Sequence, residues 1–140
     1  MYEKILVALD GSEGSRKALA AAVEMARTFG AELHSLAVEG KLPAYAATLG
    51  EVDEAKAEKD AFFDRIDREA VAFAAERGVE LRPTKMVGDP ADRVVHFAES
   101  GGFDLLVLAS RGHSLAHRFH LTGTADKIVD HAPCSTLLVR

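Results

Sequence analysis

The sequence predicts an α/β fold: a doubly wound, five-stranded parallel sheet with strand order 3-2-1-4-5 and helices on both faces. Short apolar runs alternate with segments of helical periodicity along the whole chain, and such alternation builds a parallel sheet with right-handed crossovers. One run, 105–109, is apolar throughout, as in a central strand buried on both faces. Another, 80–87, contains Pro83, which cannot donate to a ladder and suits an edge strand. The order 3-2-1-4-5 satisfies both positions.

The first part of the chain predicts a strand, a helix and a second strand. Residues 4–9 form a compact apolar run, which the sequence Asp-Gly-Ser at 10–12 breaks sharply. The apolar residues that follow recur on one helical face until Gly30, a residue type common at helix C-termini. The next apolar segment, 32–38, is the second strand. Because this strand follows a helix, a crossover joins the two strands.

The middle of the chain predicts a loop, a long helix, an edge strand and a third helix. Residues 39–51 lack a sustained period and predict a long, mobile loop. Apolar residues then recur on one face of a helix over 52–77. After the edge strand at 80–87, Asp89 is suited to cap a helix and Pro90 to occupy its first position.

The last part of the chain predicts an anion-binding loop between the fourth strand and the fourth helix. The strand at 105–109 runs into a glycine-containing turn, and the helix begins at Thr124, its expected N-cap. Backbone N–H groups of the turn and the positive end of the helix dipole converge on this loop, which favours an anion such as phosphate. In the order 3-2-1-4-5, ligands bind outside the carboxyl ends of the first and fourth strands, where Asp10 and Gly112 lie.

The same region carries a motif: Ala-Ser-Arg-Gly at 109–112, a loop, Gly-Thr at 123–124, an amphipathic helix, and His-Ala-Pro-Cys at 131–134. This pattern resembles the C-terminal half of universal stress protein domains. The nucleotide-binding branch of that family has Gly, two residues, Gly, nine residues, Gly and then Ser or Thr around the ribose and phosphates of ATP. Gly112, Gly123 and Thr124 match that pattern, whereas Ala109 replaces the first glycine and ten residues separate Gly112 from Gly123.

The resemblance implies a single domain over residues 1–140 that binds ATP with Mg²⁺ at the sheet's switch point and acts as a regulator in the stress response. It also implies a homodimer through the last strand, 135–139, whose uncovered edge invites pairing. From its position beside Gly112, we also expect Arg111 to add positive charge near the phosphates. The implied site residues are Ala8, Leu9 and Asp10 at the adenine and ribose edge, Val38 and Leu108 beside the base, and Ala109, Gly112, Gly123, Thr124 and Ala125 along the ribose and phosphates.

Two other functions fit the residues. Ala109 and the longer loop favour a dimeric interaction module of the same fold that binds no nucleotide. The spacing of His113, His117 and His120 favours a metal-binding protein, because histidines four apart on a helix can share one metal ion. The sequence has no nucleophile elbow, P-loop or paired-carboxylate signature, so we expect a protein that is not an enzyme.

Composition narrows the class of protein further. A net charge of −5 without a basic cluster argues against a nucleic-acid partner. The chain has one cysteine, Cys134, so no disulfide forms within it, and no apolar stretch is long enough to cross a membrane. The first residues lack the pattern of a signal peptide. These features predict a cytoplasmic protein.

Overall fold

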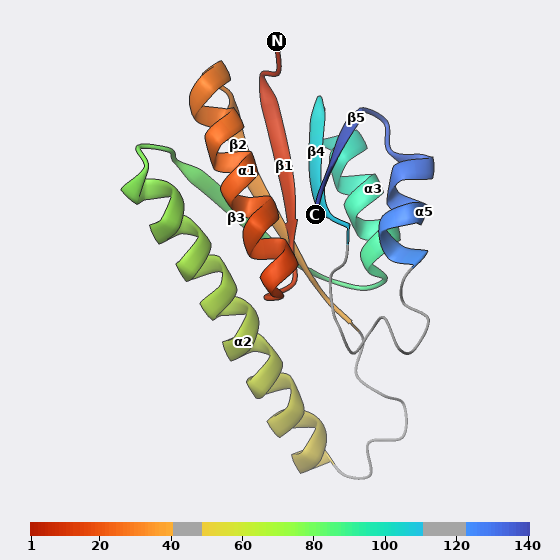
Figure 1. Ribbon diagram of the computed structural model, residues 1–140. Coiled ribbons are helices and arrows are strands. Elements are labelled where there is room, and N and C mark those ends of the chain that lie inside the picture. Colours follow the sequence, from red (N-terminus) through yellow and green to blue (C-terminus); the bar gives the residue numbers. More distant parts are fainter. Residues whose placement is uncertain (41–48, 111–122) are drawn as a thin grey trace.

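The computed structural model describes residues 1–40, 49–110 and 123–140, and its five parallel strands form one sheet in the order β3-β2-β1-β4-β5 (Figure 1). The predicted fold class and strand order are confirmed. The strands are β1 (Lys4–Leu9), β2 (Glu32–Glu39), β3 (Leu81–Val87), β4 (Leu105–Ala109) and β5 (Ser135–Val139). The described helices are α1 (Glu13–Phe29), α2 (Leu49–Glu76), α3 (Pro90–Ser100) and α5 (Gly123–His131).

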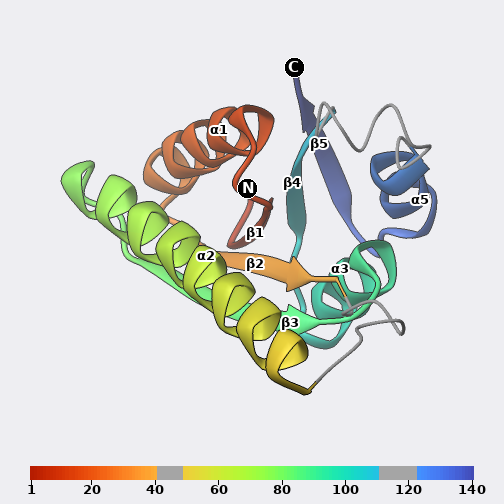
Figure 2. The same cartoon turned by 90° about the horizontal axis from the view of Figure 1, so that it is seen from below.

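The helices cover both faces of the sheet, as predicted. Figure 2 shows α1 and α2 on one side and α3 and α5 on the other. Side chains alternate between the faces along each strand: in β1, Ile5 and Val7 pack in the cluster that contains α1 and α2, whereas Leu6 packs with α3 and α5. In the described part of the chain, no helix is both long enough and apolar enough to span a membrane.

Local sequence signals set the ends of two helices. The Ser12 hydroxyl caps α1 by accepting the backbone N–H of Ser15 at 3.1 Å, and Gly30 ends the helix with φ of 65°. The Asp89 carboxylate caps α3 by accepting the N–H of Asp92 at 3.0 Å, with Pro90 in the first turn. These helix boundaries were therefore predictable from sequence.

Three other boundaries differ from the prediction. The strand β2 continues through Glu39, and α2 begins at Leu49 rather than at residue 52, so both ends of the segment predicted as a loop belong to regular elements. The helix α5 begins at Gly123, so Thr124 lies within its first turn and is not the N-cap. Helix ends depend on how the chain packs as well as on local residue type, which explains shifts of a few residues.

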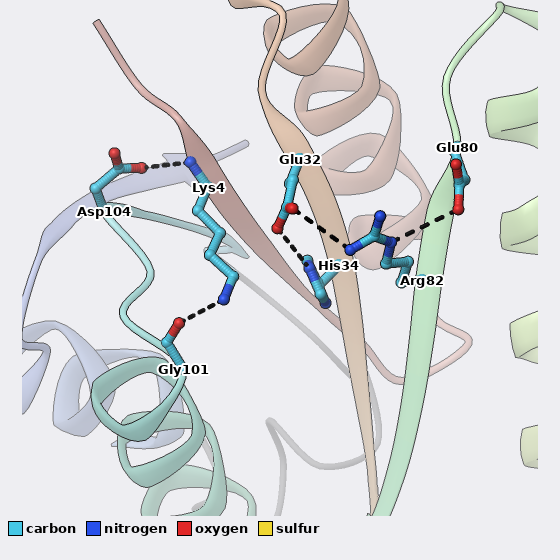
Figure 3. A network of polar contacts seen from close by, with 7 residues as sticks. All are labelled: Lys4, Glu32, His34, Glu80, Arg82, Gly101 and Asp104. Atoms are coloured by element: carbon cyan, nitrogen blue, oxygen red, sulfur yellow. Dashed lines mark hydrogen bonds and ion pairs between the residues drawn. The ribbon is translucent and has the colours of Figure 1, made fainter.

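Polar contacts join the strands at the amino-terminal end of the sheet (Figure 3). The Asp104 carboxylate, just before β4, accepts the backbone N–H groups of Glu3 and Lys4 at 2.9 and 3.0 Å, and the Lys4 ammonium donates to the carbonyl of Gly101 at 2.6 Å. These contacts hold β1 and β4 in register. A separate set of ion pairs joins β2 to β3, and its side chains are Glu32, His34, Glu80 and Arg82.

Candidate functional site

The candidate site lies where β1 and β4 end side by side. Both strands are central and parallel, with Val7 opposite Val107 in the register. From β1 the chain crosses to β2 on one side, and from β4 it crosses to β5 on the other. A parallel sheet opens a crevice at such a switch point, outside the carboxyl ends of the strands. Residues that follow β1 and β4 are therefore brought to one edge.

The turn between β1 and α1 holds Asp10 at this edge. Its carboxylate accepts the backbone N–H of Ser12 at 2.9 Å, while its own N–H donates to the hydroxyl of Ser15 at 3.4 Å. Gly11, between Asp10 and Ser12, has φ of 81°, a backbone conformation that residues with a Cβ rarely adopt. Ser15 is buried and also donates to the Ser12 carbonyl at 3.0 Å. These local hydrogen bonds orient the half-buried Asp10.

The apolar residues implied for the base divide between the two faces of the sheet. Ala8, Val38 and Leu108 all pack in the cluster on the α3 and α5 side. Leu9 packs instead in the cluster with α1 and α2 and is 5% exposed. Ala8 and Val38 are half-buried, so they form the accessible part of an apolar wall, and Leu108, 3% exposed, packs behind them. The side chain of Leu9 points away from this wall.

The alanine at the first glycine position is compatible with the backbone there. Ala109 is the last residue of β4, where it pairs with Val139 of β5, so its backbone is extended. Extended backbone suits alanine without strain. The N–H of the next residue, Ser110, donates to the Val139 carbonyl at 2.9 Å, which anchors the chain as it leaves the strand.

The start of α5 supplies the anion-favouring end of a helix. Thr124 and Ala125 are half-buried in its first turn, directly after Gly123. The first backbone N–H groups of a helix have no acceptor within it and carry its positive dipole end. Since α5 leads into β5, which runs parallel to β4, the helix begins at the end of the sheet where β1 and β4 finish (Figure 1).

Several predicted residues lie outside the described part of the chain. Arg111 and Gly112 are among them, and so are the histidines proposed for a metal site, His113, His117 and His120. Among the residues that the structure does describe, no group of three His, Cys, Asp or Glu side chains is placed to hold a metal ion.

A buried carboxylate was missed by sequence reasoning. Glu39, the last residue of β2, is 5% exposed, and burial together with the nearby Asp60 carboxylate raises its pKa. Lys85 of β3 lies nearby and pairs with Asp64 of α2, their side-chain nitrogen and oxygen 2.5 Å apart. Because side chains alternate between the two faces along β2, Glu39 lies on the face that α2 covers. Extending the strand by one residue would have revealed this inward position.

Comparison with known proteins places the chain in a family. The model of the universal stress protein family matches residues 1–140. The chain belongs to the universal stress protein family. Universal stress protein YxiE of Bacillus subtilis is 33% identical over 148 residues, which cover all of both chains. A universal stress protein of Thermus aquaticus is 32% identical over 143 residues, again covering both chains completely.

Solved structures agree with this assignment. Universal stress protein UspA from Lactobacillus plantarum superposes with a TM-score of 0.87 at 28% identity, covering 99% of this chain and 98% of that one. A universal stress protein solved in complex with cAMP superposes with a TM-score of 0.77 at 24% identity, covering 99% of this chain and 97% of that one. The predicted resemblance is therefore confirmed at the level of family and fold.

Proposed function

We propose that this universal stress protein is a regulator that binds an adenine nucleotide, ATP with Mg²⁺, at the carboxyl ends of β1 and β4. The observation that carries the proposal is the convergence of three features at this switch point. They are the oriented carboxylate of Asp10, the apolar wall on the α3 and α5 side, and the first turn of α5. Each feature matches one part of a nucleotide: ribose, base and phosphates.

The residues present fit these three parts chemically. Ala8 and Val38, both half-buried, offer an apolar surface to the flat base, and the buried Leu108 packs behind them. The Asp10 carboxylate can accept hydrogen bonds from ribose hydroxyls, and carboxylate oxygen is also a ligand type that Mg²⁺ prefers. The backbone N–H groups at the start of α5, beside Thr124, favour phosphate oxygens. Bound Mg²⁺ would neutralise part of the phosphate charge.

Proteins of the same fold support the choice of an adenine nucleotide. The structure with cAMP is one of them. A universal stress protein from Archaeoglobus fulgidus in complex with dAMP has a TM-score of 0.66, and one from Arabidopsis thaliana with AMP bound has a TM-score of 0.69. Their identities of 21% and 19% relate them to this chain through the fold, and the extension of nucleotide binding to this chain is our proposal.

The test is calorimetric titration with ATP and GTP, with and without Mg²⁺, on protein freed of bound ligand by unfolding and refolding. Asp10→Asn keeps an oxygen that can accept the Ser12 N–H, but it loses the charge. We expect this variant to bind ATP about tenfold more weakly, the loss of roughly 1.4 kcal/mol. Asp130→Asn, an exposed acid beyond the first turn of α5, is the matched control. The absence of any nucleotide binding, or equal affinity for GTP, would contradict the proposal.

A second role, as a dimeric interaction module, is favoured by the outer edge of β5. Within the described ranges β5 pairs with β4 alone, so its outer edge carries backbone groups that are free to pair. Leu138 on this strand is 42% exposed. We propose a homodimer through this edge, and Leu138→Lys should weaken it. Sedimentation of the native chain as a monomer at micromolar concentration would refute the dimer without bearing on nucleotide binding.

A further inference from the structure

A pocket of about 280 Å³ lies between α1 and α2, on the side of the sheet that faces away from the proposed base wall. Figure 2 shows these two helices together on this side. The volume is close to the lower end of the range for small-molecule sites. Apolar side chains of β1, α1 and α2 line it, together with the charged side chains of Arg16, Arg65 and Glu69.

The wall of the pocket is apolar and partly open to water. Leu9, Leu19 and Ile66 are buried side chains of the core on this face. Phe62 also lines the pocket, yet it is 43% exposed. A bound apolar group would remove part of this ring from water, and each square ångström so removed contributes about 25 cal/mol. The pocket therefore favours a ligand with an apolar body.

The charged residues that line the pocket favour an anion at its mouth. Arg16 and Arg65 are exposed, so their guanidinium groups reach toward solvent, and Glu69 is the carboxylate among the lining residues. Arg16 and Glu69 approach each other only to 4.0 Å, the outer limit of an ion pair. Among the residues that the structure describes, Arg65 forms no ion pair. Two guanidinium groups and one carboxylate give the pocket opening a net positive charge. The planar guanidinium of Arg65 can bind a ligand carboxylate through two parallel hydrogen bonds.

We propose that this pocket binds a small amphipathic carboxylate, with its apolar body against Phe62 and Ile66 and its carboxylate at Arg65. The site is separate from the proposed nucleotide site, since its side chains lie on the opposite face of the sheet. The two sites can therefore be tested separately.

Octanoate is a suitable probe, and octylammonium is its counterpart with the opposite charge. We expect octanoate to shift the methyl NMR signals of Leu19 and Ile66 in a saturable way, and octylammonium to bind at least fivefold more weakly. Arg65→Gln should weaken octanoate binding about fivefold, the loss expected of one partly exposed ion pair. Arg68→Gln, an exposed arginine of the same helix outside the pocket lining, should leave the affinity unchanged.

Phe62→Ala provides a second variant that tests the apolar wall. Because Phe62 is partly exposed, the variant should fold, and it should weaken octanoate and octylammonium alike. The proposal is overturned if octanoate produces no saturable shift at millimolar concentration. It is equally overturned if octylammonium binds as tightly as octanoate, or if Arg65→Gln and Arg68→Gln behave in the same way.

Discussion

Replacing Gly11 with alanine should destabilise the chain more than the same change at Gly30. Both glycines have positive φ, 81° and 65°, so both replacements place alanine in a left-handed conformation. Their surroundings differ. A Cβ at Gly11 would lie 2.8 Å from Cζ of Phe62 and 3.0 Å from Cδ1 of Ile66, whereas a Cβ at Gly30 would meet no atom within 4 Å. Gly30 is therefore the matched control for the steric contact.

The two costs can be separated by magnitude. Left-handed backbone costs a residue with a Cβ about 1–2 kcal/mol, and both variants carry this cost. The Phe62 ring is 43% exposed and can move aside, but Ile66 is 9% exposed and packed in the core. Crowding of a packed side chain costs about 1 kcal/mol or more. We therefore expect Gly30→Ala to lose about 1–2 kcal/mol and Gly11→Ala about 2–3 kcal/mol.

Urea unfolding of the native chain and both variants measures these differences. In thermal unfolding, each kcal/mol should lower the midpoint by roughly 3 °C for a chain of this size. Combining Gly11→Ala with Phe62→Ala in a double-mutant cycle should recover part of the contact cost as a coupling energy. Equal destabilisation at Gly11 and Gly30 would refute the reasoning, because it would mean that α2 does not press on the β1–α1 turn.

Three further predictions concern pH, a helix cap and the core. Burial and Asp60 raise the pKa of Glu39 above its ordinary 4.5, so the folded chain holds that proton more tightly and loses stability as pH rises through the raised pKa. In urea unfolding, the Glu39→Gln variant should therefore be more stable than the native chain near pH 7, but not near pH 4. An equal difference in the free energy of unfolding at both pH values would contradict this. Asp89→Ala should cost about 1 kcal/mol through the lost α3 cap, and an unchanged thermal midpoint would refute it. Leu106→Ala, at a side chain with no exposed surface in β4, should cost about 2–5 kcal/mol by leaving a cavity, whereas a cost below 1 kcal/mol would mean that the core collapses around it.

The sheet order was predictable because two strands carried distinctive residues. Pro83 lies in β3 at one edge, and the apolar run of β4 is buried beside β1. A residue without a backbone N–H and a run without polar side chains each exclude many positions in a sheet. Asp89 and Gly30 were equally informative, since their caps depend on residues close in sequence.

The candidate site was only partly predictable. The strand order makes β1 and β4 parallel neighbours whose carboxyl ends lie together, so the position of Asp10 at the switch point could be expected. The face on which each side chain lies depends on strand register, and here Leu9 turns away from Ala8 and Leu108. Which of these residues contact a nucleotide stays a prediction.

By itself the sequence determined the class of fold, the strand order, the caps of two helices and the resemblance to universal stress proteins. These properties rest on local residue types and on periodicity, which short stretches of chain encode. Only the tertiary structure decided that Glu39 is buried beside Asp60, and that α1 and α2 enclose a pocket with Arg65 among its lining residues. Such features arise where residues far apart in sequence meet, and the distances and desolvation that define them exist only once the chain has packed.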